Sequence, residues 1–82
     1  MKVVILKFVL RQILAYVLGD RSKVEHAVAL AEASYQEGDK AFTRRGRIYR
    51  SVKEWAPSTT PRYLVDLGTE VAATLDELSR SK

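Results

Sequence analysis

The apolar positions of the 82-residue chain fall into four segments with helical spacing, separated by glycines and prolines. Residues 2–18 are almost wholly apolar and end at Gly19, a residue that takes the left-handed conformation of a helix C-terminus without steric cost. A run of this length without turn residues exceeds the usual length of a strand. We therefore expect a helix over residues 2–18, with a strand over residues 2–9 as the alternative.

The second segment begins with a recognisable helix signal. Ser22 is followed three residues later by Glu25, which is the pattern of a capping box. This pattern predicts a helix over residues 23–37, ended by the glycine that follows. Small residues recur along or beside the apolar stripe of this helix and predict the close approach of a neighbouring helix: Ala27, Ala31 and Ser34.

Residues 40–56 predict an amphipathic basic helix. When the residues are placed at about 100° each, the large apolar side chains share one arc and most basic side chains share the opposite arc. Arg45 is the exception, because it falls in the apolar arc. Gly46 leaves open a kink or a break into two short helices. The apolar arc contains Phe42, Ile48, Tyr49, Val52 and Trp55. The helical spacing of Tyr49 and Trp55 favours a place in the core over stacking on bases.

The linker over residues 57–61 ends this helix, because the residue before a proline favours extended backbone. With Thr60 as the N-cap, the pattern predicts a last helix over residues 61–80. Gly68 and Ala72 are four residues apart on one face and allow a close approach. A seam suited to packing along another helix is formed by Leu64, Leu67, Val71, Leu75 and Leu78.

Together the four segments predict an all-α fold, a small bundle of three to four helices in a single domain over residues 1–82. The first and last helices are expected to supply most of the core. The content of 46% apolar and 29% charged residues is that of a folded domain and not of a disordered chain.

The composition argues against catalytic and metal chemistry. The chain has no cysteine, which excludes disulfides, thiolate metal sites and a cysteine nucleophile. Its single histidine, His26, excludes any site that needs two imidazoles, and the four glycines lie too far apart for a phosphate-binding loop. We therefore expect no enzyme activity, no cofactor and no metal site.

Charge is unevenly distributed along the chain. The net charge of +4 arises from a balance of +4 over residues 1–23, −4 over residues 24–39, +6 over residues 40–62 and −2 over residues 63–82. The strongly basic third segment predicts an anionic partner, and nucleic acid is the first choice because arginine forks match phosphate geometry.

The candidate nucleic-acid-binding residues are Lys40, Arg44, Arg45, Arg47, Arg50 and Lys53. Since no Asn or Gln accompanies them to read adenine, we expect contacts to the backbone, most plausibly of a double-stranded nucleic acid. Two alternatives stay open. The arginines either pair with acids of the second and fourth helices within the chain, or bind anionic lipid.

The first helix is apolar around more than half of its circumference, which exceeds the need of a small monomer. This pattern predicts a helix buried between subunits of a homo-oligomer. A central core helix and a membrane-surface helix are the alternatives, and two interior charges argue against a membrane span. The candidate interface consists of Ile5, Val9, Leu10, Ile13, Val17, Leu64, Val71 and Leu78.

The resulting hypothesis is a small self-assembling structural protein that binds a nucleic-acid backbone without sequence preference, in the manner of a helical nucleoprotein coat or a chromatin-like protein. One alternative is a protein-interaction module with an apolar helix-binding face. A peripheral membrane protein is the third possibility. No cleavage motif of a secretory signal follows Leu18, so the cytoplasm or a virion is the expected location.

Overall fold

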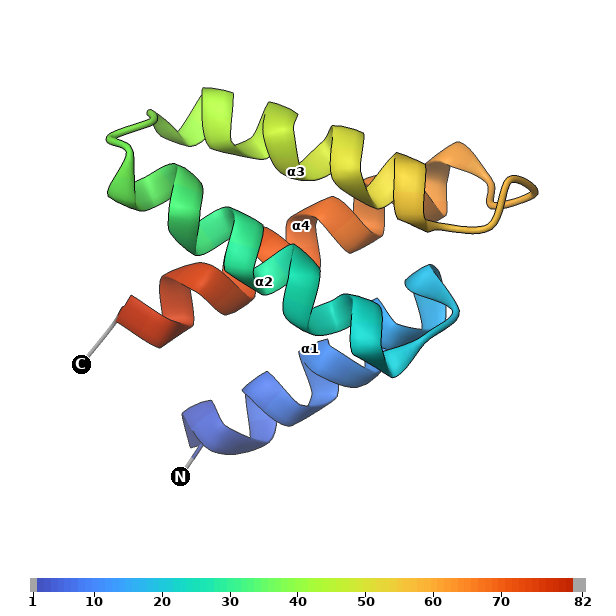
Figure 1. Ribbon diagram of the computed structural model, residues 1–82. Coiled ribbons are helices and arrows are strands. Elements are labelled where there is room, and N and C mark those ends of the chain that lie inside the picture. The colour runs from blue at the N-terminus through green and yellow to red at the C-terminus, as the bar shows by residue number, and fades with distance from the viewer. Residues whose placement is uncertain (1, 81–82) are drawn as a thin grey trace.

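The computed structural model describes residues 2–80, apart from the side chain of Val3, and contains four α-helices (Figure 1). These are α1 (Lys2–Leu18), α2 (Arg21–Gln36), α3 (Ala41–Trp55) and α4 (Arg62–Arg80). The prediction of an all-α bundle is confirmed, and the described residues form no strand, so the strand alternative for residues 2–9 is wrong.

The ends of the first two helices show which capping signals the chain uses. Gly19 and Gly38 have φ values of 76° and 84°, as expected for residues that end a helix in the left-handed conformation. The predicted capping box is wrong, because Asp20 caps α2 and its carboxylate accepts a hydrogen bond from the backbone N–H of Ser22 at 2.9 Å. Asp20 has extended backbone directly after Gly19, so the helix begins before Ser22 can serve as its cap.

The third helix is continuous, and the fourth helix begins later than expected. α3 runs without a break through Gly46, so the break that the sequence leaves open does not occur. The cost of an interior glycine, about 1 kcal/mol, is outweighed by the burial of Ile48 and Val52 in the same helix. α4 begins at Arg62, one residue later than expected, because the carbonyl of Pro61 accepts its first backbone hydrogen bonds.

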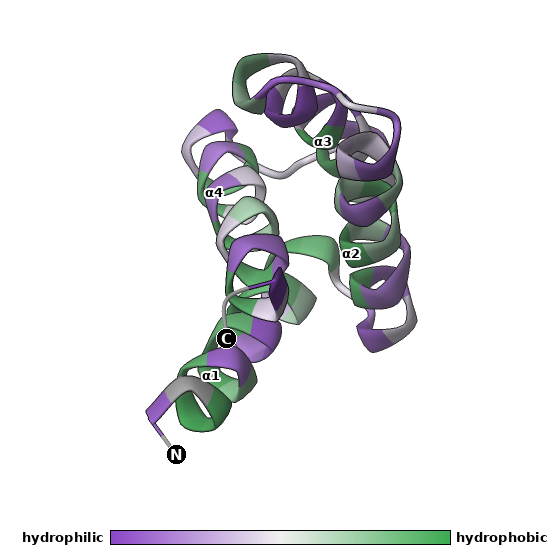
Figure 2. Cartoon of the chain, turned by 90° about the vertical axis from the view of Figure 1, so that its left-hand side faces the viewer, coloured by the Kyte–Doolittle hydropathy of each residue, from purple (hydrophilic) through white to green (hydrophobic). Residues whose placement is uncertain are grey.

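The helices are arranged around α4, which packs against all three others and most extensively against α1. α1 and α4 run antiparallel, so the two ends of the described chain lie on the same side of the molecule (Figure 1). α1 and α3 lie on opposite sides of the bundle in both views (Figures 1 and 2). Within the chain, α1 therefore packs mainly on α2 and α4, and its other side is left at the edge.

The core contains fourteen buried apolar residues, eight of which come from α1 and α4, as the sequence pattern predicts. The expected leucine seam of α4 is only partly correct, since Leu67 is exposed and Leu64 and Leu78 are half-buried. The buried arc is instead centred on Ala72 and is rotated by roughly one residue, about 100°, from the seam. Of the seam leucines only Leu75 is buried, and smaller residues such as Gly68, Ala72 and Ala73 make up much of the buried face.

Gly68 lies where α4 meets α1 and α3. A Cβ atom at this position would lie 3.0 Å from Cγ1 of Val17 and 3.1 Å from Cγ1 of Val52. Both distances are shorter than normal carbon–carbon contacts, so the two valines pack directly on the backbone of α4. The predicted close approach at Gly68 and Ala72 is therefore confirmed.

The change Gly68→Ala is expected to lower the free energy of unfolding by about 1–2 kcal/mol, because overpacking outweighs the helix-propensity gain of alanine. Gly46→Ala is the matched control: no atom lies within 4 Å of its Cβ position, and a gain of about 0.5–1 kcal/mol is expected. Chemical denaturation of the two variants measures the difference. Equal stabilisation by both would show that Gly68 does not limit the helix packing.

Candidate nucleic-acid and self-association surfaces

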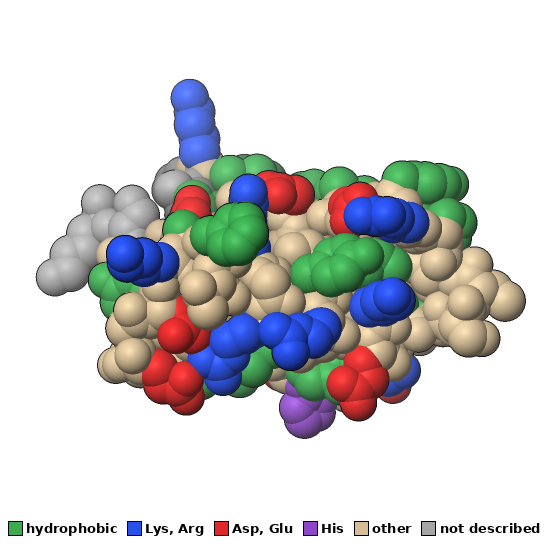
Figure 3. All heavy atoms as spheres, turned by 90° about the horizontal axis from the view of Figure 1, so that it is seen from above, with side chains coloured by type: hydrophobic (Ala, Val, Ile, Leu, Met, Phe, Trp, Pro, Cys, Tyr) green, Lys and Arg blue, Asp and Glu red, His purple; other side chains and the backbone are tan. Residues whose placement is uncertain are grey.

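The six candidate nucleic-acid-binding residues lie on α3 or at its N-cap. Figure 3 shows the molecule from the side on which α3 lies. Basic and acidic side chains are interspersed on this face, so it is not a continuous basic surface (Figure 3). Three of the six residues form ion pairs within the chain: Arg44, Arg45 and Arg47.

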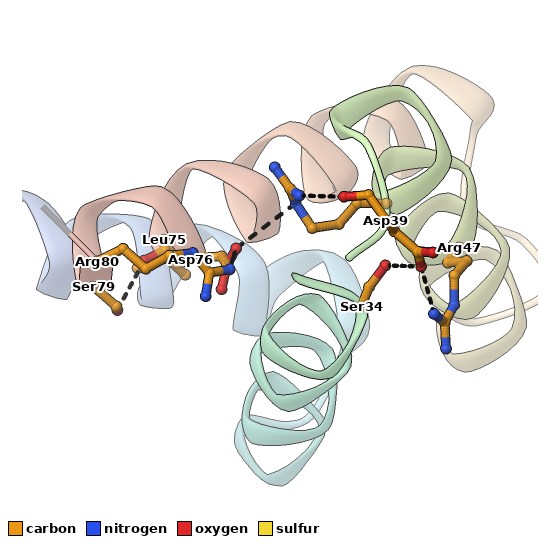
Figure 4. A network of polar contacts seen from close by, with 8 residues as sticks. Ser34, Asp39, Arg47, Leu75, Asp76, Ser79 and Arg80 are labelled. Carbon is orange, nitrogen blue, oxygen red and sulfur yellow. Dashed lines mark hydrogen bonds and ion pairs between the residues drawn. The ribbon is translucent and has the colours of Figure 1, made fainter. Parts of the chain in front are cut away.

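Arg47 ties α3 to the turn that follows α2. Its guanidinium donates to Glu37 and to Asp39, in both cases at 2.6 Å. Asp39 also accepts a hydrogen bond from the hydroxyl of the buried Ser34 (Figure 4). This hydroxyl, followed by Arg47, lowers the pKa of Asp39, while Asp39 and Glu37 raise the pKa of Arg47. The pKa of the Asp39 carboxyl is lower in the folded chain than in the unfolded chain, where it is about 4. Ionised Asp39 therefore stabilises the turn above about pH 4, and this stabilisation is lost as the pH falls through the folded pKa.

Arg44 belongs to a second, more deeply buried group of charges. Asp76 of α4 is buried and accepts a hydrogen bond from Arg80, one turn away on the same helix (Figure 4). Arg44 Nε lies 3.8 Å from the same carboxylate, and the Arg44 side chain is only 12% exposed. Arg44 and Arg80 also lie against the ring of Tyr35, at 5.5 and 3.4 Å from its centroid. This cluster joins α2, α3 and α4.

Arg45, the basic residue that falls in the apolar arc of the helical wheel, pairs with Glu70 of α4. Both side chains are 53% exposed, and ion pairs at such positions contribute little to stability. Lys40, Arg50 and Lys53 are exposed and form no ion pair with any residue of the described range 2–80. The alternative of pairing within the chain therefore applies to three of the six residues, and the other three remain accessible to a partner.

The candidate interface residues divide into exposed, buried and half-buried ones. Ile5 and Val9 are 66% and 45% exposed. Val17 and Val71 lie in the core of the chain and are not exposed to a second copy, and Val17 packs on α4 at Gly68. The remaining candidates are half-buried: Leu10, Ile13, Leu64 and Leu78.

The side of α1 that faces away from the bundle is apolar, and sequence reasoning missed most of it. Phe8 and Tyr16 are 62% and 76% exposed, although aromatic rings are usually at least partly covered. On the helical wheel Tyr16 lies opposite the buried Leu14 and Leu18. Phe8 lies about 100° from them and lines a cavity that α1 forms with α2. We define the outer face of α1 as Val4, Ile5, Phe8, Val9 and Tyr16.

No helix within residues 2–80 is long and apolar enough to cross a membrane. Over the same residues, no group of three or more histidine, aspartate and glutamate side chains is placed to hold a metal ion. Comparison of the chain with protein families, curated proteins and solved structures gave no match.

The role of Arg44 in the buried cluster leads to a stability prediction. Arg44→Gln removes a charge partner of Asp76 and is expected to lower the free energy of unfolding by about 1–3 kcal/mol. Arg50→Gln is the control on the same helix, and its exposed, unpaired side chain predicts a change within about 0.5 kcal/mol. Urea denaturation distinguishes the two. Equal effects would mean that Arg44 is not part of the stabilising cluster.

Proposed function

We propose that the protein is a self-associating helical protein in which the outer face of α1 binds a second copy of the same chain. The observation that carries this proposal is the exposure of the outer face of α1. Its five residues are between 45% and 76% exposed, and α1, which consists largely of hydrophobic residues, lies at the edge of the bundle (Figure 2).

The size of this surface suits a dimer contact. With aromatic side chains at about 150–250 Å² each, the five residues of the outer face expose on the order of 600 Å². Stable interfaces bury about 800 Å² on each partner, and an exposed apolar patch of several hundred Å² marks an interaction site. The outer face of α1 thus supplies most of such an area, and a chain of 82 residues gains stability from the added burial.

Charge favours an antiparallel arrangement of the two α1 helices. α1 contains basic residues but no acidic ones, so a parallel pair would place Lys2 beside its own copy. In an antiparallel pair, Ile5 lies opposite the partner's Tyr16, and Lys2 approaches the end of the partner's helix, where Asp20 is exposed. A two-fold contact of this kind is the commonest form of homo-oligomer.

Phe8→Ser is expected to weaken self-association at least tenfold, because burial of a phenylalanine side chain contributes about 1.5–3 kcal/mol. Phe42→Ser is the matched control, since Phe42 is 90% exposed on α3, away from the outer face of α1. Analytical ultracentrifugation over a dilution series measures both dissociation constants. A Phe8→Ser variant that associates as tightly as the control would contradict the proposed interface.

A second function, binding of nucleic-acid phosphates, is favoured by the basic residues that are not paired within the chain. Lys40, Arg50 and Lys53 are exposed along α3, and Arg62 follows at the start of α4. Because α1 and α3 lie on opposite sides of the bundle, a dimer through α1 leaves both copies of this basic surface outward (Figures 1 and 2). Such an assembly presents two positive surfaces to a phosphate backbone.

The affinity for a DNA duplex of arbitrary sequence, measured by fluorescence anisotropy, is expected to fall steeply as the salt concentration rises. The triple variant K40Q/R50Q/K53Q should reduce the salt slope by about 2–3 per protomer, since each released phosphate contact contributes close to one. R45Q/E70Q is the control, because it removes an ion pair without changing the net charge. Absence of binding at low salt, or a triple variant that binds like the wild type, would contradict this function.

A further inference from the structure

A cavity of 350 Å³ opens between the C-terminal half of α3, the linker and the start of α4. Its volume lies within the range of small-molecule sites, about 300–1,000 Å³. Lys53 and Arg62 line it, together with the hydroxyl-bearing Ser58 and Thr60. Tyr49 and Val65 add an aromatic and an apolar wall. The cavity therefore combines two positive charges and hydrogen-bonding groups with a surface that suits an organic ring.

The charge balance of this cavity differs from that of its neighbours. Three other cavities, with volumes of 220, 250 and 380 Å³, each contain two arginines and one glutamate. No acidic residue lines the cavity between α3 and α4. Lys53 and Arg62 also form no ion pair with any residue that the structure describes, in contrast to Arg44, Arg45 and Arg47. Two unpaired cations facing one cavity repel each other, and a bound anion would remove this repulsion.

The position of Arg62 adds to the positive potential. Lys53 lies in the last turn of α3, where the helix dipole favours a cation. Arg62 lies in the first turn of α4, where the dipole disfavours one, and no acidic residue in that turn compensates. Arg62 is therefore at a position where its charge costs stability unless an anion is present.

We propose that this cavity binds a nucleotide, with its phosphate between Lys53 and Arg62 and its sugar or base against Tyr49. Arginine contacts two phosphate oxygens at once, and lysine adds a mobile point charge, a combination suited to a group that carries more than one negative charge. A tyrosine ring provides a stacking surface for a base. The inference rests on the proposed binding of nucleic-acid phosphates and names the place where one nucleotide of a strand is held.

The test uses two probes, adenosine monophosphate and a short single-stranded oligonucleotide, titrated into the full-length protein and followed by NMR chemical shifts. Binding of the mononucleotide should perturb the signals of Tyr49 and Thr60. The variant K53Q/R62Q should weaken it at least tenfold, and the oligonucleotide should lose affinity in the same variant.

K40Q/R50Q is the matched control, because it removes the same amount of charge from the same side of the molecule without touching the cavity. All four side chains are exposed, and thermal melts followed by circular dichroism check that both variants keep the fold. If the oligonucleotide binds but K53Q/R62Q weakens it no more than K40Q/R50Q does, the cavity proposal is overturned and the proposed function stands. If the wild type binds neither probe nor a duplex, both are overturned. Binding of the mononucleotide alone would identify a free nucleotide as the ligand and overturn the assignment to a strand.

Discussion

The arrangement of the four helices depends on the close contact at Gly68, where α4 meets α1 and α3. Because this residue has no Cβ, Val17 and Val52 pack directly on the backbone of α4 from two neighbouring helices. α4 becomes the centre of the bundle, and α1 is placed at its edge with one side covered by α2 and α4. The apolar residues on the other side of α1 then have no partner within the described chain, and the proposed self-association follows from this geometry.

Burial of Asp76 has a comparable effect on the charged residues. A buried carboxylate requires positive partners, and Arg44 and Arg80 provide them while also packing on Tyr35. Arg47 is held in turn by Glu37 and Asp39. Arg44 and Arg47 therefore stabilise the fold, whereas Lys40, Arg50 and Lys53 form no ion pair within residues 2–80. In the proposed function, the basic helix thus combines a stabilising role with a binding role, which its composition alone does not separate.

The sequence predicts the helices well because their signals are local. Glycines with positive φ end α1 and α2, and helical periodicity marks the apolar faces. The predicted buried face of α4 differs from the observed one because the observed face depends on where α1 and α3 contact Gly68. A helical wheel of one segment does not contain this information. The partners of Arg44 and Arg45 were not identified individually for the same reason, since Asp76 and Glu70 lie on another helix. The cavity between α3 and α4 was missed because its lining residues come from two helices and the linker between them.

The central claim is that two copies of the chain meet through the outer face of α1. Sedimentation equilibrium of the wild-type protein at micromolar concentration tests this claim most directly. The account predicts a mass of twice the 9.3 kDa of one chain, falling toward the single-chain value on dilution. A mass of 9.3 kDa at every concentration would contradict the claim.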